Sequence, residues 1–128
     1  GVTAEHLCRA ALESIAHQVA DVLEVMELNG HPLRVDGGAA ASDLLLKLQA
    51  TIVGREIHRP ATLEVTGLGV AYLAGLEVGV WRSTAELRRQ RSRDRQFDPD
   101  PNLSVVSRAR WREAVQRSRG WMPGTVLL

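Results

Sequence analysis

The stretch that decides the fold is Leu33-Arg-Val-Asp-Gly-Gly-Ala-Ala-Ala-Ser42. Its pattern predicts a strand over 33–36, a turn at Gly37 and Gly38, and a helix from about 40 to 53. Unpaired amides at a helix start, together with the helix dipole, favour a phosphate or another acceptor-rich group. Two glycines remove side chains, so a ligand can lie against the main chain. In parallel sheets such turns lie beyond the carboxyl ends of strands, where ligands bind.

The turn also has plainer interpretations. A Gly-Gly pair after a strand is common in tight turns that bind nothing, and this segment has neither the G-x-x-x-x-G-K-[ST] nor the G-x-G-x-x-G pattern. Asp36 could be a general base, although an aspartate that fixes the turn by bonding its own backbone is the favoured interpretation. The pattern alone therefore leaves nucleotide binding open.

A long helix is predicted before this stretch. Thr3 is a plausible N-cap, and the helix runs to about Leu28, where Asn29 and Gly30 suit a left-handed C-cap. Apolar residues recur at helical spacing and predict one buried stripe. Its members are Leu12, Ile15, Val19, Val22, Leu23 and Met26.

The segments after the turn complete a repeating strand–helix pattern. Gly54 ends the helix over 40–53, whose predicted inner residues are Leu44, Leu45, Leu48 and Ile52. A short strand over 56–58 precedes Pro60, and a helix over 66–79 follows, with small residues at Gly67, Ala71 and Gly75 that permit close approach of another element. Such short connections predict a right-handed parallel βαβ unit.

The C-terminal part is predicted to be mostly helical. Ser83 and Glu86 match a capping box that opens a polar helix through about Arg91. Residues 96–103 are rich in Pro, Asp and Asn and predict a loop. A last helix over 107–118 places Trp111, Ala114, Val115 and Ser118 on one face, and 120–128 is expected to be a frayed tail.

Composition restricts the class of protein. A chain of 128 residues, 45% of them hydrophobic, can build one core, and a net charge of +1 gives little reason to expect a polyanionic partner. Cys8 is the only cysteine, so no internal disulfide can form, and we expect a half-buried thiol and a reducing, cytoplasmic location. No leader is apparent, and the stretch 65–76 is too short for a membrane span. The chain starts just before a helix, as if cut from something longer.

The residues also bear on three other functions, which are nucleic-acid binding, metal binding and self-association. The arginines between Arg82 and Arg119 could bind nucleic acid, but interspersed acids favour a solvated helix face. His6 and His17 lie about 16 Å apart along one helix, too far to share a metal. A self-associating module would cover apolar surface on the first helix by forming a homo-oligomer.

Three segments resemble the glycerol kinases of the FGGY carbohydrate kinase family, in order and at familiar spacing. The first is the stretch Leu33 to Gly54, which contains VDGGAAASDLLLKLQATIVG. The second is Arg59-Pro60 followed by Glu64-Val-Thr-Gly-Leu-Gly-Val-Ala-Tyr-Leu-Ala-Gly75. The third is the opening His6-Leu-Cys-Arg-Ala-Ala-Leu-Glu13, which looks like the tail of a signature of the family.

The resemblance implies an α/β fold, the C-terminal part of an actin-like, ribonuclease H-like ATPase domain. Residues 1–128 would be the last portion of the second, nucleotide-binding domain. In the family the second glycine of this turn touches the nucleotide through its backbone, and a polar residue four positions later lies beside the adenosine. Those positions are Gly38 and Ser42, and Gly37 and Ala39 would shape the turn. The family usually has asparagine where this chain has Ser42.

The resemblance also implies what lies outside these residues. The catalytic aspartate, the glycerol-binding residues and most of the phosphate-binding turns have no matching positions here, so the chain alone is predicted to be inactive. The implied ligands are ATP or ADP with Mg²⁺ held mainly outside this chain, and glycerol bound by the missing N-terminal part. We expect a homo-oligomer, and neither a nucleic-acid nor a membrane partner.

Overall fold

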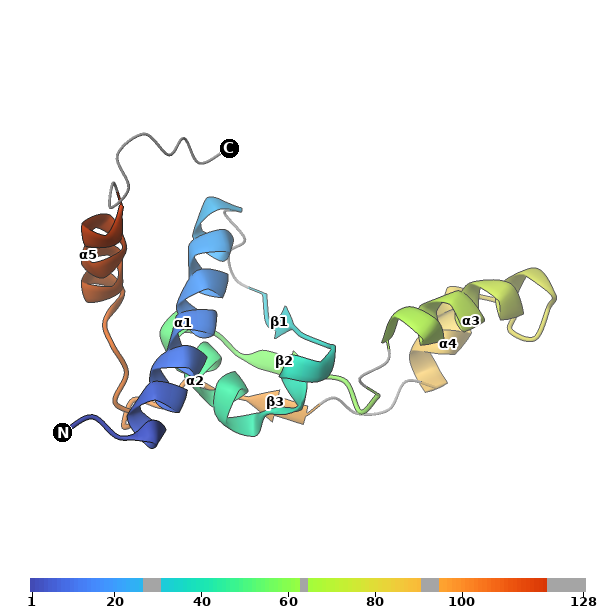
Figure 1. Cartoon of the computed structure of the whole chain (residues 1–128). Helices are drawn as coiled ribbons and strands as arrows, with labels where there is room; N and C mark the ends of the chain where they lie inside the picture. Colours follow the sequence, from blue (N-terminus) through green and yellow to red (C-terminus); the bar gives the residue numbers. More distant parts are fainter. Residues whose placement is uncertain (27–30, 63–64, 91–94, 120–128) are drawn as a thin grey trace.

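The computed structural model describes residues 1–26, 31–62, 65–90 and 95–119. Figure 1 shows two parts, which we call the body and the arm. The body contains α1, α2, the strands and α5, whereas the arm consists of α3 and α4. The elements are α1 (Ala4–Val25), β1 (Leu33–Arg34), the 3-10 helix η1 (Gly38–Ala41), α2 (Asp43–Val53), β2 (Ile57–Arg59), α3 (Val65–Glu77), α4 (Thr84–Gln90), β3 (Arg95–Phe97) and α5 (Arg108–Ser118).

The sheet has the order β1-β2-β3. Strands β1 and β2 are parallel, with Leu33 opposite Ile57, which confirms the predicted parallel pairing around α2. Strand β3 is antiparallel to β2 and places Phe97 opposite Ile57. The prediction of a loop from residue 96 is therefore wrong at its start, because Phe97 gains burial by joining the sheet.

The core of the body lies between α2 and the sheet. Leu46, Ala50, Ile57 and Phe97 form one cluster, each at most 4% exposed. Gly54 ends α2 in the left-handed conformation, with φ 70°, as predicted. Two details of the prediction are wrong: the residues before Asp43 form a 3-10 turn in place of a first α-helical turn, and Leu44 faces outward while Leu46 faces the sheet.

Helix α1 begins as predicted but buries a different face. Thr3 is the N-cap, and its amide donates to Nδ1 of His6 at 3.1 Å. The helix ends at Val25, and the predicted C-cap at 29–30 lies outside the described residues. Of the predicted stripe only Leu23 is fully buried; the buried residues of α1 are Glu13, Ala16, His17, Ala20 and Leu23.

The shift of this face has a physical cause. Helices α1 and α2 pack together, and small side chains such as Ala16 and Ala20 allow close contact between helices. The polar Glu13 is covered by the segment before α5, since its carboxylate accepts the amide of Val106 at 3.1 Å. Ile15 and Val22 remain 42% and 57% exposed.

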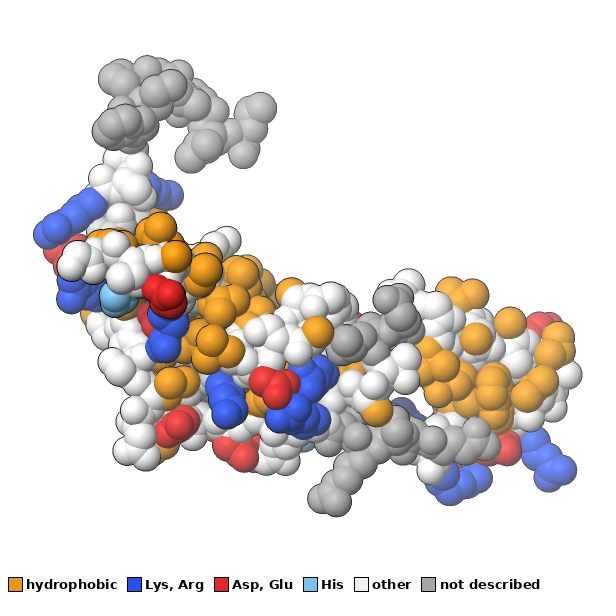
Figure 2. Space-filling model, turned by 60° about the horizontal axis from the view of Figure 1, so that its bottom comes forward, with side chains coloured by type: hydrophobic (Ala, Val, Ile, Leu, Met, Phe, Trp, Pro, Cys, Tyr) orange, Lys and Arg blue, Asp and Glu red, His pale blue; other side chains and the backbone are white. Residues whose placement is uncertain are grey.

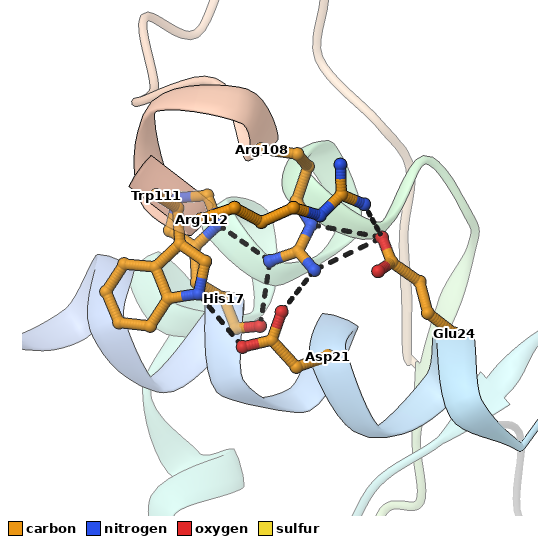
Figure 3. Close-up of polar contacts among 6 residues, drawn as sticks. All are labelled: His17, Asp21, Glu24, Arg108, Trp111 and Arg112. Atoms are coloured by element: carbon orange, nitrogen blue, oxygen red, sulfur yellow. Dashed lines mark hydrogen bonds and ion pairs between the residues drawn. The ribbon is translucent and has the colours of Figure 1, made fainter. Parts of the chain in front are cut away.

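Helix α5 is held on α1 by a polar cluster (Figure 3). Arg108 pairs with Asp21 and Glu24, and it donates to the backbone oxygen of His17 at 3.0 Å. The indole of Trp111 donates to Asp21 at 2.9 Å and stacks on the His17 ring, with 4.9 Å between centroids. None of the residues of α5 is fully buried, so polar contacts account for much of its attachment.

These contacts change the pKa values of the cluster. Burial lowers the pKa of His17, and the adjacent Arg108 guanidinium lowers it further. Burial alone would raise the pKa of Asp21, but hydrogen bonds from Trp111 and Arg108 outweigh it, so this pKa is lowered. The cluster is therefore most stable with a neutral His17 and an ionised Asp21.

Within the arm, the Trp81 ring packs closely against Gly75 of α3. A Cβ added there would lie 2.1 Å from the Trp81 ring, which confirms that this glycine permits close approach. Tyr72 meets Trp81 edge-on, with 5.3 Å between ring centroids. The close-approach prediction is not borne out elsewhere on α3, because nothing lies within 4 Å of a Cβ built at Gly67, and Ala71 is exposed.

The outer surface of the arm is apolar. Figure 2 shows hydrophobic side chains gathered over it, at the right of the view. Val70 and Leu73 of α3, and Val78 and Val80 between α3 and α4, are each at least 64% exposed. Ser83 accepts the amide of Glu86 at 3.3 Å, as predicted for a cap of α4.

The remaining expectations concern the thiol of Cys8, a membrane-spanning helix and the C-terminal tail. Cys8 is exposed, so the predicted half-buried thiol is wrong. None of the helices in the described part of the chain is both long and apolar enough to cross a membrane. The expected tail over 120–128 lies outside the described residues.

Candidate nucleotide-binding turn

The turn that follows β1 has a geometry that only glycine adopts easily. Gly37 has φ 81° and ψ 177°, a region in which a side chain costs about 1–3 kcal/mol. The amide of Ala40 donates to the carbonyl of Gly37 at 3.1 Å, and the amide of Ser42 donates to that of Ala39 at 3.2 Å. These two amides are used within the turn, so they are not free to hold a ligand.

The surface of the turn is open. Gly37, Gly38 and Ala39 are exposed, and a Cβ built on either glycine would meet nothing within 4 Å. Gly38 has no positive φ, so no steric or backbone constraint within the described residues requires glycine there. A flat ligand could therefore lie directly against the main chain at Gly38.

Ser42 is the N-cap of α2. Its hydroxyl oxygen accepts the amide of Leu45 at 3.3 Å, and the next residue, Asp43, adds a carboxylate to the first turn. The serine cap satisfies one of the amides that would otherwise attract an anion, and the acid interacts favourably with the helix dipole. This start of α2 is thus poorly suited to a phosphate, whereas the Ser42 hydroxyl keeps a hydrogen to donate to a neutral group.

One residue that sequence reasoning missed lies directly behind the turn. Arg59, at the end of β2, donates to the carbonyls of Ala40 and Ala41 at 2.8 and 3.1 Å and pairs with Asp43 at 2.9 Å. In the sequence, Arg59 stands out only through the Arg59-Pro60 pair, which contributes to the resemblance. No local pattern indicates this contact, because it joins residues 18 and 19 positions apart across the βαβ unit.

The most voluminous of the three main cavities lies beside the turn and not at it. This cleft of about 940 Å³ is bounded by the ends of β1 and β2 and by the arm. Val35, Asp36 and Pro60 line it from the body, and Tyr72 and Leu87 line it from the arm. The four residues of the predicted nucleotide site, Gly37, Gly38, Ala39 and Ser42, do not line this cleft.

The described residues do not provide a metal site. They contain no group of three or more His, Cys, Asp and Glu side chains that could hold an ion. Near the turn, both carboxylate oxygens of Asp43 are bound by arginines, Arg59 and Arg95. The residues present at the turn therefore do not fit a Mg²⁺ ion.

Many of the C-terminal arginines are paired with acids. Arg95 pairs with Asp43, Arg112 with Glu24 and Arg117 with Glu113. Arg108 lies inside the cluster of Figure 3. Ion pairing of this kind leaves less free positive charge for a nucleic-acid backbone than the sequence count suggests.

Comparison with known proteins identifies the family. Residues 1–78 match the model of the C-terminal domain of the FGGY family of carbohydrate kinases, and the chain belongs to this family. The chain is 51% identical to a glycerol kinase of Pseudothermotoga lettingae, over 95% of this chain and 26% of that protein.

Solved structures agree on the fold. A Plasmodium falciparum glycerol kinase with ADP superposes on 100% of this chain with a TM-score of 0.74 and 29% identity, which covers 26% of that protein. A xylulose kinase of Lactobacillus acidophilus superposes on 91% of this chain with a TM-score of 0.65, and the match covers 24% of that protein. At 21% sequence identity this likeness shows the fold alone. These neighbours confirm the α/β, actin-like assignment, and the chain spans about a quarter of the relatives it matches.

Proposed function

We propose that this chain forms one wall of the adenine-nucleotide site of a glycerol kinase. The complete protein would transfer the γ-phosphoryl group of ATP to glycerol and yield glycerol 3-phosphate. The observation that carries the proposal is the 51% identity to a glycerol kinase across 95% of the chain, including the whole turn. The likeness to a glycerol kinase solved with ADP supports the choice of nucleotide.

The geometry of the turn supports a specific part of the nucleotide. An open backbone at Gly38 suits a flat adenosine, whereas the capped, acidic start of α2 disfavours the phosphates. We therefore infer that Gly37, Gly38, Ala39 and Ser42 face the nucleoside, with Gly38 in backbone contact. The phosphates and the Mg²⁺ that accompanies them would be held mainly by residues outside this chain, as would glycerol.

Calorimetric titration of the chain with Mg-ADP and with Mg-GDP tests the nucleotide assignment. We expect weak binding of ADP, with a Kd near about 1 mM because half of the site is absent, and no measurable binding of GDP. Equal heats for the two nucleotides, or none for either at several millimolar, would contradict the assignment.

An activity measurement tests the larger proposal. The chain alone is expected to phosphorylate no glycerol, because the catalytic aspartate of the family has no match in it. The same residues joined to the N-terminal part of a glycerol kinase are expected to restore formation of glycerol 3-phosphate. Activity on xylulose or gluconate, without activity on glycerol, would contradict the proposal that glycerol is the substrate.

Self-association is a second candidate property, favoured by the exposed apolar surface. Large apolar side chains are 42% to 71% exposed in both parts of the chain: Ile15 and Val22 on α1, Met26 directly after it, and Val70 and Leu73 on α3. Hydrophobic side chains gather on the arm in Figure 2, and an exposed apolar patch is typical of a protein interface. Sedimentation should reveal a homo-oligomer that dissociates after Val70→Glu and Leu73→Glu substitution, and a monomer at all concentrations would refute it.

We also place the protein in the cytoplasm. Its one cysteine is exposed, and an exposed free thiol is typical of proteins in a reducing compartment.

A further inference from the structure

Arg59 connects the sheet to the turn through a nearly buried side chain. It is the last residue of β2, its side chain is 14% exposed, and its Nη1 lies within 3.1 Å of the carbonyl oxygens of both Ala40 and Ala41. The same nitrogen lies 2.9 Å from Asp43, the first residue of α2. One guanidinium therefore contacts the end of the turn and the start of the helix after it.

A second arginine supports the first from the neighbouring strand. Arg95 lies opposite Arg59 in the β2–β3 register, and it pairs with the other carboxylate oxygen of Asp43 at 2.8 Å. Both guanidinium groups lie over the ring of buried Phe97, at 5.2 and 5.1 Å from its centroid. Asp43 thus joins two arginines that are themselves packed on the core.

The turn needs such support because its own bonds are weak. It is a single 3-10 turn held by hydrogen bonds from residue i+3 to residue i. It begins at Gly38, directly after Gly37, and glycines lose more backbone entropy on ordering than any other residue. A carbonyl and the next amide share one rigid plane, so fixing the carbonyls of Ala40 and Ala41 also fixes the amides of Ala41 and Ser42. Charge-assisted bonds of this kind are about twice as strong as neutral ones.

We propose that Arg59 is a positioning residue for nucleotide binding, which holds the turn Gly37–Ser42 in its binding geometry before the nucleotide arrives. Arg59 touches the turn from behind and does not touch the nucleotide. The consequence for affinity rests on the proposed nucleotide site, whereas the ordering of the turn is a property of the free chain. Each can be tested separately.

The test without ligand compares amide solvent-exchange rates by NMR in the wild-type chain and in three variants. Arg59→Ala should speed exchange at Ala40 and Ser42, whose amides donate within the turn, by roughly 10- to 100-fold. Arg59→Lys, whose ammonium can still reach one carbonyl, should give an intermediate change and guards against a general loss of folding. Arg95→Ala is the matched control: it removes a neighbouring cation that does not touch the turn, and we expect a change below about 3-fold.

Amides of α1 report whether the fold is intact and should exchange at unchanged rates in all three variants. If Arg59→Ala leaves Ala40 and Ser42 within about 2-fold of wild type, or if Arg95→Ala has an equal effect, the positioning role is overturned. This result stands whether or not the chain binds nucleotide.

The test with ligand uses Mg-ADP on the same variants. Arg59→Ala should weaken binding about 10-fold, Arg59→Lys less, and Arg95→Ala by under about 2-fold. Unchanged affinity in Arg59→Ala would overturn the link between the turn's order and binding. Absence of ADP binding in the wild-type chain would refute the proposed site alone, since the exchange rates would still decide the ordering role.

Discussion

The body and the arm of this chain differ in how they are stabilised. The body has a core in which Leu46, Leu48, Ala50 and Ile57 are at most 1% exposed. In the arm the one fully buried residue among those described is Gly75, and large apolar side chains face outward. The candidate site lies on the body, next to its core. We infer from this difference that the chain can order the turn by itself, whereas the arm offers apolar surface for contacts with other protein segments.

The largest expected effect on the free energy of unfolding distinguishes a core residue of the body from an exposed residue of the arm. Ile57→Ala removes a side chain that is 0% exposed and should lower the free energy of unfolding by about 2–5 kcal/mol. Leu73→Ala, at a position 71% exposed on the arm, should change it by less than about 0.5 kcal/mol. Urea unfolding followed by circular dichroism measures both, and similar losses would contradict a core confined to the body.

The next effect concerns the arm alone. Gly75→Ala forces a Cβ to within 2.1 Å of the Trp81 ring, so we expect a local destabilisation of about 1–3 kcal/mol. Gly67→Ala is the matched control on the same helix, because nothing lies near its Cβ and alanine should stabilise α3 by up to about 1 kcal/mol. Hydrogen exchange in α3 should move in opposite directions in the two variants while the body stays unchanged. Loss of structure in the body after Gly75→Ala would show that the two parts are coupled.

The two glycines of the turn should respond differently. Gly37→Ala places a side chain at φ 81° and should cost about 1–3 kcal/mol of stability. Gly38→Ala meets no neighbour in the free chain, so stability should be nearly unchanged, while the added methyl group should weaken ADP binding by about 10-fold. Thermal unfolding and calorimetry separate the two effects. Equal affinity in wild type and Gly38→Ala would argue against backbone contact.

The smallest effect is a dependence on pH from the cluster that holds α5. The pKa of His17 is lowered in the folded chain, so the unfolded chain takes up the proton first as pH falls below about 6.5. Stability is therefore fully present above that pH and declines below it, by at most about 1.4 kcal/mol per pH unit for one group. The lowered pKa of Asp21 contributes only at lower pH, near or below the usual aspartate value.

Unfolding by urea between pH 8 and pH 5 measures this dependence. His17→Gln should abolish the decline between pH 6.5 and pH 5, because glutamine does not titrate. An equal slope in His17→Gln and wild type would assign the decline to other groups.

Local signals predicted most of the elements. The predicted caps at Thr3 and Gly54 each mark a helix boundary in the structure, and α5 begins one residue after the predicted start at 107. The parallel βαβ unit followed from short connections, which leave few other topologies. These features are set by residues near one another in the chain, and sequence reasoning found them for that reason.

Contacts between distant segments were missed. The buried face of α1 was misassigned because Glu13 and His17 are covered by the segment 104–111, which no helical periodicity reveals. Strand β3 was missed because three residues carry little signal and Phe97 is paired across the sheet. At the site, the turn was predicted, but the support by Arg59 depends on the folded arrangement of β2 and the turn.

The central claim is that the turn on the body is a half-site for an adenine nucleotide. The most direct measurement follows the backbone amides of the isotope-labelled chain by NMR as Mg-ADP is added. We expect shifts at Gly37, Gly38, Ala39 and Ser42, with α5 and the arm unchanged and no such shifts with Mg-GDP. Shifts centred on the cleft residues Asp36, Tyr72 and Leu87, or an unmoved turn at several millimolar ADP, would contradict it.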